Sequence, residues 1–488
     1  MDKNYLSYEQ FGAVGDGQHD DIEAIIACHE EANRTGRAVK TKDGATYYIG
    51  GRDISAIINT DVNFGTSKFI IDDRNVERRT SYVFIVKSEN EFFDLDTKSL
   101  TNIKSGQKTL DLPYEDELFV KIFDDNKKIF IRKGLNMNDG TSTTDCFILR
   151  KDGSVYPSID WDYPEVTRAK ARRTNDEPIT IKGGVFVTIA NEGESYYNYH
   201  HRGFDIRRSH VTITNFEHYV ENEGEHGAPY HGFIRTDDAY DVNISNAIIT
   251  PRLIYKTESK IPGKSVDMGS YDLSFYASID VRCIGVKQSI DICDSRYWGI
   301  YTSNFCKNLY LEDCVFSRFD AHQGVTNATI RNCTLGYQSI QLIGHGEFLV
   351  ENTKIKTNRP CFIYLRCDYG SIWNGNITIR NCEFENTSNF INIIGQNNTG
   401  DHDYGYVCYM PENVTIDGLR LLNGKDHDDS DTKFALLSNC NGAKAELPYR
   451  YHTTKKLSIS NITSESGLKY VVTYAPENFD DLTVIMGT

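Results

Sequence analysis

Two short pairs of residues have the chemical types and the spacing for acid–base work. Asp320 and His322 are separated by a single residue, and so are Arg366 and Asp368. Residues two apart on a strand point to the same side, so each pair would present both side chains on one face. An imidazole can accept a proton, a guanidinium can neutralise an anion, and two carboxyl groups can flank a bond that is hydrolysed.

The strands that would position these pairs belong to a repeat. Residues 211–462 repeat the pattern apolar-x-apolar-x-Asn/Asp, with starts at Ile290, Leu309, Ala328 and Phe348 among others. Alternation with a period of two indicates strands. A strand unit that recurs every ~20 residues or more cannot bury its own apolar face, so we expect stacked coils of a solenoid.

The Asn or Asp that ends each repeat has a structural explanation. Asn adopts the left-handed conformation more readily than most residues, and stacked amides hydrogen-bond along a ladder of strands. We therefore expect Asn332, Asn352 and Asn381 to form turns between sheets and not to take part in catalysis.

Residues 1–90 are expected to form an N-terminal cap and the first coils. The Gly-rich turn Phe11–Gly17 precedes two Asp residues and an amphipathic helix over residues 22–32, which Gly36 ends. This opening resembles that of the pectate-lyase-superfamily β-helix proteins, which include many phage tail spikes and polygalacturonase-like enzymes. In that family the helix caps the N-terminal end of the solenoid and protects a sheet edge from pairing with another chain.

The repeat and the resemblance together give the expected fold class. It is an all-β, single-stranded right-handed parallel β-helix with an N-terminal capping helix and a small antiparallel β insert. The insert is expected over residues 91–175, where strand-like runs such as Leu118–Phe123 and Cys146–Arg150 alternate with turn signals. Residues 176–488 are expected to form the parallel β-helix, with long loops that wall a binding groove.

Alternation within one coil predicts which side chains face outward. Phe316 and Phe319 are expected inside the coil, which turns Asp320 and His322 outward. Neighbouring coils would extend this into a column, in which the candidate catalytic residues are Asp320, His322, Tyr364, Arg366 and Asp368. The candidate substrate-binding residues on or beside the column are Trp298, Tyr301, Gln341 and His345, with His231 in a long loop.

Two mechanisms fit this column, and the sequence leaves both open. In an elimination or epimerisation, His322 or a Tyr would remove the proton next to a uronate carboxylate and Arg366 would neutralise that carboxylate. The run of basic residues from Lys354 to Arg366 would attract an anionic polymer. In a hydrolysis, Asp320 and Asp368, two coils and roughly 9–10 Å apart, would flank the bond at a separation near that of inverting enzymes.

The segment Phe319–Gln323 also resembles the Asp-Pro-His-Glu motif of mannuronan C5-epimerases, which are β-helix proteins as well. That resemblance implies that Asp320 and His322 lie at the uronate. Ala321 and Gln323 replace the Pro and Glu of the motif, and Ser317 stands where that family has its catalytic Tyr.

Composition excludes several other classes of protein. The net charge of −16 argues against nucleic-acid binding, which needs concentrated Lys and Arg. No secretory signal is visible at the N-terminus, and no apolar run approaches the ~18 residues of a membrane span. The 12 Cys residues lack a Cys-x-x-Cys pair, so we expect no zinc site. We expect no other metal site and no cofactor, and a bound Ca²⁺ stays open although nothing indicates one.

The family resemblance implies a protein that binds and depolymerises a bacterial surface or capsular polysaccharide, in the manner of a phage tail spike. It also implies a homotrimer that is extracellular or virion-associated without a signal peptide, with the cytoplasm as the alternative location. Other functions stay open at this point. They are a non-catalytic glycan-binding or receptor-binding β-helix protein, a C5-epimerase, and a depolymerase of teichoic acid or of a polypeptide capsule.

Overall fold

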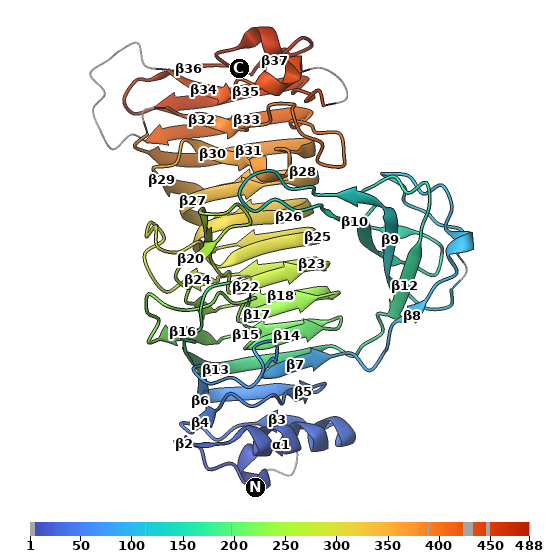
Figure 1. Cartoon of the computed structure of the whole chain (residues 1–488), viewed down its shortest axis with the longest axis vertical. Helices are drawn as coiled ribbons and strands as arrows, with labels where there is room; N and C mark the ends of the chain where they lie inside the picture. Colours follow the sequence, from blue (N-terminus) through green and yellow to red (C-terminus); the bar gives the residue numbers. More distant parts are fainter. Residues whose placement is uncertain are drawn as a thin grey trace.

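The computed structural model describes residues 5–487 except 113, 197, 389, 423–432 and 446–448. The chain winds into a tall stack of coils with the N-terminus at one end and the C-terminus at the other, and a separate lobe projects from one side (Figure 1). Neighbouring coils pair through parallel strands along the whole stack. The expected parallel β-helix with a helical cap and an antiparallel insert is confirmed. Within the described residues, no helix is both long and apolar enough to cross a membrane.

The strands of successive coils line up on three faces of the solenoid. The longest strands bend at a corner and contribute to two or three faces. The first face contains β5 (Ala56–Ile58), β7 (Phe84–Lys87), β14 (Phe204–Arg207), β17 (Ile234–Asp237), β22 (Leu273–Tyr276), β25 (Tyr301–Glu312), β26 (Val315–Arg331), β27 (Thr334–Leu342), β30 (Cys361–Leu365), β32 (Asn392–Gly395), β34 (Lys433–Leu437) and β36 (Lys469–Val471).

The second face adds β1 (Tyr5–Leu6), β3 (Ala38–Lys40), β6 (Val62–Asp72), β13 (Ile179–Ile189), β15 (Val211–Thr214), β18 (Tyr240–Ser245), β23 (Ile279–Ile284), β28 (Gly344–Glu351), β31 (Trp373–Asn386), β33 (Asn413–Leu422), β35 (Lys456–Ser464) and β37 (Thr483–Met486). The third face adds β2 (Asp16–Asp20), β4 (Thr46–Ile49), β16 (Glu217–Glu221), β19 (Ile248–Ile249), β24 (Lys287–Gln288) and β29 (Lys354–Thr357). A loop carries the short hairpin of β20 (Tyr255–Glu258) and β21 (Ser265–Met268).

The interior is a continuous apolar column. Val242 pairs in register with Val281, Val281 with Leu309, and Leu309 with Ala328, and all are buried. One strand alone could not bury these side chains, but each coil covers the apolar face of the previous one.

The turns between the second and third faces explain why Asn recurs in the repeat. Asn332, Asn352 and Asn381 have φ values of 53°, 48° and 49°, which is the left-handed conformation expected for them. The Asn352 amide also donates a hydrogen bond of 3.2 Å to Asn332 Oδ1 in the coil below. These Asn residues therefore hold the corners of the solenoid, as the sequence predicts.

We expect Asn352→Val to destabilise the protein by about 1–2 kcal/mol, because a β-branched residue with positive φ is strained. Asn352→Gly should cost much less, since glycine adopts this conformation freely. Chemical denaturation of both variants measures the difference. Equal losses for valine and glycine would mean that the side-chain ladder, and not the backbone conformation, is what matters here.

One repeat was assigned wrongly from the sequence. The segment Ile290–Asp294, expected to start a coil, lies in a loop between β24 and β25. The strand of that coil is β23, which begins at Ile279 and is followed by Gly285 with φ 65°. At this corner glycine stands where the other coils have Asn, so the strand does not match the repeat pattern. The loop segment Ile290–Asp294 matches the pattern by chance.

The N-terminal cap is helix α1 (Ile22–Thr35), which packs its buried residues over the first coil. Asp21 precedes the helix, but its carboxylate accepts hydrogen bonds from the Val14 and Gly15 amides at 2.7 and 3.2 Å instead of capping the helix itself. The carboxylate therefore fixes the Gly-rich turn to the cap.

The projecting lobe is a sheet of β8 (Phe93–Asp94), β9 (Leu118–Ile129), β10 (Thr141–Leu149), β11 (Val155–Tyr156) and β12 (Arg168–Arg173), all antiparallel. It has an apolar core of its own and packs Phe119, Cys146 and Ile148 against coil residues. The buried ammonium of Lys307 lies 2.6 Å from Asp145 of the lobe. The lobe, called the insert below, is thus fixed to its own β-helix.

Candidate active site

The predicted column of outward side chains exists on the first face. Asp320 pairs in register with Gln341, and Gln341 with Tyr364. Tyr301 does not belong to it, contrary to expectation. It aligns with Phe319, is 1% exposed, and its hydroxyl donates to Cys314 Sγ at 3.4 Å inside the core. Thr302 occupies the expected place, because a shift of one residue moves a side chain to the opposite face of a strand.

Asp320 is the centre of a buried network of charges. Its two carboxylate oxygens accept hydrogen bonds from Arg366 Nη1 at 2.5 and 2.7 Å. Arg318 Nη2 lies 2.8 Å from the same carboxylate, and the Tyr271 hydroxyl donates to it. Asp320 is fully buried, so it holds the arginines in place and does not reach a bound ligand.

Arg366 extends this network to Asp368, to which its Nε and Nη2 donate at 3.1 and 2.8 Å. Arg132, from the tip of the β9–β10 hairpin, lies 2.8 Å from the same carboxylate. The ion network consists of Arg132, Arg318, Asp320, Arg366 and Asp368. Three guanidinium groups and two carboxylates leave it with one net positive charge.

Neither carboxyl group of the ion network can serve as an acid. Burial would raise the pKa of Asp320, but the charges of Arg318 and Arg366 outweigh it and lower the pKa to about 2. Burial is likewise outweighed at Asp368, where Arg366 and Arg132 lower the pKa below its usual range. Both carboxylates are therefore ionised at neutral pH.

His322 lies beside the ion network and presents an unprotonated ring nitrogen. Its Nδ1 is 3.0 Å from Asn304 Oδ1, and because that oxygen can only accept, Nδ1 carries the proton and Nε2 keeps a free lone pair. Burial first, and then the charge of Arg366, lowers the pKa of His322 to about 3. The imidazole is therefore neutral at physiological pH, and its edge packs against Tyr369 with 5.5 Å between ring centroids.

A cleft of about 390 Å³ opens at His322. Strands contribute Arg235, Ser274, Tyr276, Thr302, Asn304, His322 and Gln323 to its lining. Long loops contribute Tyr199, Tyr230, His231, Gly269, Tyr271 and Trp298. Because Arg235, Ser274 and Thr302 pair in register from coil to coil, the cleft follows the axis of the solenoid.

The predicted residues other than Tyr301 therefore divide into four groups. His231, His322 and Trp298 line the cleft, and Asp320, Arg366 and Asp368 form the ion network beside it. Gln341 and Tyr364 continue the column but line no described pocket, and the Gln341 amide donates to the Gln338 carbonyl. His345 lies apart, against Trp161 of the insert, with 4.5 Å between ring centroids.

Sequence reasoning missed several residues of this site, among them Asn304 and Tyr276 in the lining of the cleft. Arg318 lies two positions before Asp320 on the same strand, so the alternation that places His322 could have placed it too. Arg235 lines the cleft on an earlier coil and pairs with Asp237 at 2.8 Å. Tyr271 and Arg132 come from a loop and from the insert, and no periodic pattern indicates them.

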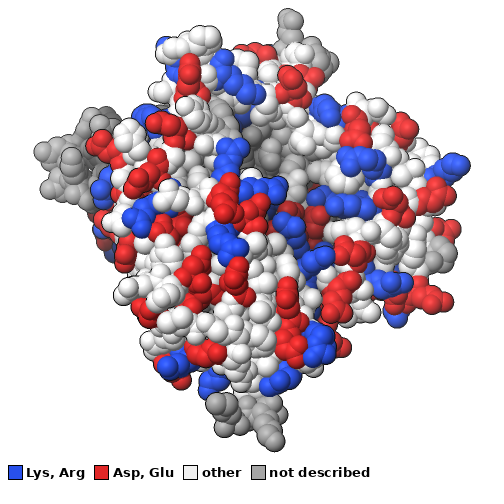
Figure 2. Space-filling view, turned by 60° about the horizontal axis from the view of Figure 1, so that its bottom comes forward, with Lys and Arg blue, Asp and Glu red and all other residues white. Residues whose placement is uncertain are grey.

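The expected basic patch is not free to attract a polymer. Lys354 and Lys356 pair with Glu385 at 2.9 and 3.5 Å, and Arg359 donates to the Tyr337 hydroxyl. Figure 2 shows Lys and Arg mixed with Asp and Glu over one face of the molecule. In the part of the chain that the structure describes, no three His, Cys, Asp or Glu side chains gather in a way that could hold a metal ion.

Solved structures of phage proteins share this architecture. The tailspike gp61 of the Pseudomonas phage phi297 matches with a TM-score of 0.51 at 12% identity, over 99% of this chain and 84% of that one. This chain has the fold of the phage tailspikes. The Gp54 tailspike of the Acinetobacter baumannii bacteriophage AP22, solved with an A. baumannii capsular saccharide, matches with a TM-score of 0.50 at 9% identity, over 96% of this chain and 77% of that one. No protein-family model and no curated protein matches the sequence.

Proposed function

We propose that the protein binds an acidic bacterial surface or capsular polysaccharide in the cleft and cleaves it by elimination. The observation that carries the proposal is the neutral His322 imidazole, oriented by Asn304 in a cleft whose described lining contains Arg235 and several aromatic rings but no Asp or Glu. A proton acceptor, a guanidinium and aromatic faces suit a sugar ring that carries a carboxylate.

The reaction needs three contributions from the chain. His322 Nε2 removes the proton from the carbon next to the carboxylate, and the electron pair moves toward the carboxylate, which Arg235 pairs with. The pair then forms a carbon–carbon double bond as the glycosidic carbon–oxygen bond breaks. Tyr276, whose pKa burial raises, keeps its proton at neutral pH and can give it to the departing oxygen.

The ion network beside the cleft contributes to this arrangement. Arg366 binds two carboxylates and does not line the cleft, so we assign it a positioning role. Arg235 donates one hydrogen bond to Asp237 and lines the cleft, so we give it the contact with the substrate carboxylate. The net positive charge of the network favours an anionic sugar nearby. Hydrolysis by Asp320 and Asp368 is less well supported, because an inverting hydrolase needs one carboxyl group that is protonated.

The likeness to tailspikes, one of them solved with a capsular saccharide, supports a polysaccharide as the substrate. It also supports a virion-associated or extracellular location, which we propose along with the activity and with the homotrimer that the family resemblance implies. Incubation of the purified protein with capsular and lipopolysaccharide preparations, followed by mass spectrometry, tests the proposal. Products with ultraviolet absorbance from a new double bond are expected. New reducing ends without absorbance would mean hydrolysis, and binding without products would mean a non-catalytic receptor-binding protein.

The pH dependence of cleavage is a separate prediction. A base must be deprotonated to act, so activity is lost as the pH falls through the pKa of His322. Since that pKa is about 3 in the free protein, kcat/KM should hold its plateau down to about pH 4. A bound substrate carboxylate would raise the pKa of His322, so kcat should begin to fall at a higher pH than kcat/KM.

Initial rates over a pH series measure both profiles, and circular dichroism at each pH shows whether the protein is still folded. If kcat/KM fell with a midpoint near the ordinary histidine value of ~6.5, His322 would not be the base, or its surroundings would be far more solvated than in this structure.

A further inference from the structure

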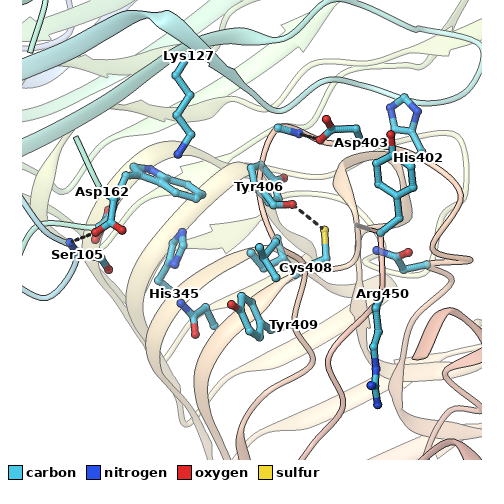
Figure 3. Close-up of a pocket in the computed structure, with 18 residues that line it drawn as sticks. Ser105, Lys127, Asp162, His345, His402, Asp403, Tyr406, Cys408, Tyr409 and Arg450 are labelled. Atoms are coloured by element: carbon cyan, nitrogen blue, oxygen red, sulfur yellow. Dashed lines mark hydrogen bonds between the residues drawn. The ribbon is translucent and has the colours of Figure 1, made fainter. Parts of the chain in front are cut away.

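A second pocket lies between the insert and the C-terminal coils, and no residue of the cleft lines it. Its volume is about 450 Å³. The insert contributes Ser105, Lys127, Asp160, Trp161 and Asp162, while the coils contribute His345, Ile372, Asn374 and the segment around Tyr406 and Tyr409. In Figure 3 the Lys127 side chain extends from the insert toward the space that His345 and Tyr409 border from the β-helix side. We call this pocket the insert groove.

We propose that the insert groove is a second carbohydrate-binding site, which holds an oligosaccharide segment of the polymer apart from the cleft. The inference rests on the proposed function for the class of ligand. The site itself is argued from the lining of the groove.

Aromatic rings on both walls provide faces for sugar rings. Trp161 of the insert packs at 5.3 Å from Tyr406, with ring planes tilted by 37°, and edge-on to His345 at 4.5 Å. Tyr409 stacks on His452 at 4.9 Å. These contacts hold the rings in fixed orientations, so little conformational entropy is lost when a flat ligand packs on them.

The polar groups of the groove are available to a ligand. Among the described residues, no hydrogen-bond partner is found for the Trp161 indole N–H, for either ring nitrogen of His345, for the Asn374 amide or for the Lys127 ammonium. Burial lowers the pKa of His345, so its imidazole is neutral and can both donate and accept a hydrogen bond. Sugar hydroxyls, which also donate and accept, match such a set.

Other ligand classes fit the groove less well. Ile372 and Val407 are its aliphatic side chains, so a lipid or an apolar peptide would leave the polar groups without partners. Asp162 and Asp403, which accept hydrogen bonds from the Ser105 and Gly405 amides, also line the groove, and their carboxylates disfavour a further anion. A neutral stretch of polysaccharide therefore suits the groove better than a strongly anionic one.

A wall of packed side chains separates the two sites. Tyr369 contacts His322 on the cleft side and Phe130 on the other, with ring centroids 5.5 Å apart in each pair. Phe130 in turn packs against Trp161 at 6.3 Å and Tyr406 at 5.5 Å. Each site can thus be occupied independently, although the insert packs directly on the coils.

The three tryptophans of the chain make the sites separately observable. Trp161 lines the insert groove, Trp298 lines the cleft, and Trp373 is fully buried. The Trp298→Phe protein reports on the groove and the Trp161→Phe protein on the cleft. Both are titrated with oligosaccharide fragments prepared from a panel of bacterial capsular polysaccharides, and tryptophan fluorescence is recorded.

We expect a saturable fluorescence change in the Trp298→Phe protein. Adding Asn374→Ala should weaken the apparent affinity about tenfold, the effect of one lost hydrogen bond to a hydroxyl. Thr415→Ala, a substitution on a neighbouring strand that lines neither site, should leave the affinity unchanged.

Each outcome decides the inference. A response of Trp298 without any response of Trp161 would overturn the second site and leave the proposed function intact. A response of Trp161 in a protein that yields no cleavage products would support the site and contradict the catalytic proposal. If neither tryptophan changed its fluorescence with any fragment, both the second site and the proposed function would be rejected.

Discussion

Polymer cleavage by the His322→Gln protein should be slower by about 10²–10⁴-fold, the usual contribution of a general base. Glutamine is close to histidine in size and can still hydrogen-bond to Asn304, but it has no basic nitrogen to take the proton. Binding of the polymer should change little, since Arg235 and the aromatic rings of the cleft are untouched. Initial rates and an equilibrium binding assay on the same preparation separate the two effects.

Thr329→Ala is the matched control for this experiment, because Thr329 lies on the same strand, β26, but on a different face of the solenoid. It should cleave like the unchanged protein. If the His322→Gln protein cleaved as fast as the control, His322 would not be the base, and a tyrosine of the cleft would be the next candidate. Loss of binding together with cleavage would mean that His322 contacts the polymer chiefly as a ligand.

The sequence predicts the solenoid well because its signals are local. Strand alternation and the left-handed Asn at each corner depend on residues that lie within one coil, and a stack follows once each unit needs a neighbour. The places where prediction failed are also local. Gly285 adopts the left-handed conformation that Asn adopts at other corners, and Ile290–Asp294 matches the repeat pattern but lies in a loop.

The candidate site was predictable only in part, because it is built from two kinds of element. The column of Asp320, Gln341 and Tyr364 follows from the coil period, and an error of one residue was enough to misplace Tyr301. The groups that complete the site come from irregular segments. Arg132 reaches Asp368 from the insert, more than two hundred residues earlier in the chain, and no periodicity relates the two.

The contacts of Asp320 and Asp368 in the structure give them other roles than their residue types suggest. Asp320 and Asp368 resemble a pair of catalytic carboxyl groups in the sequence. In the structure one guanidinium lies between them, and both are held as ionised partners of arginines. The burial of Asp320 is what distinguishes a positioning carboxylate from a catalytic one, and burial by distant loops cannot be read from a short motif.

Replacement of Asp320 should therefore damage the fold as well as the activity. Asp320→Ala leaves Arg318 and Arg366 buried beside each other with too little negative charge, and breaking such a buried pair typically costs about 3–5 kcal/mol. We expect a loss of this size in the free energy of unfolding, measured by chemical denaturation. Asp294→Ala, which breaks the exposed pair with Arg296, should change the stability far less.

A second substitution tests whether unpaired charge is the cause. If it is, Arg318→Met in the Asp320→Ala background should recover part of the lost stability, although Arg318→Met alone should be destabilising. Arg318→Ala in the same background separates this cause from cavity filling, because alanine removes the charge but cannot fill a cavity at position 320. Additive losses in the double variant would show that Asp320 stabilises the protein through packing. The ion network would then no longer explain why this carboxylate is fully buried beside the cleft.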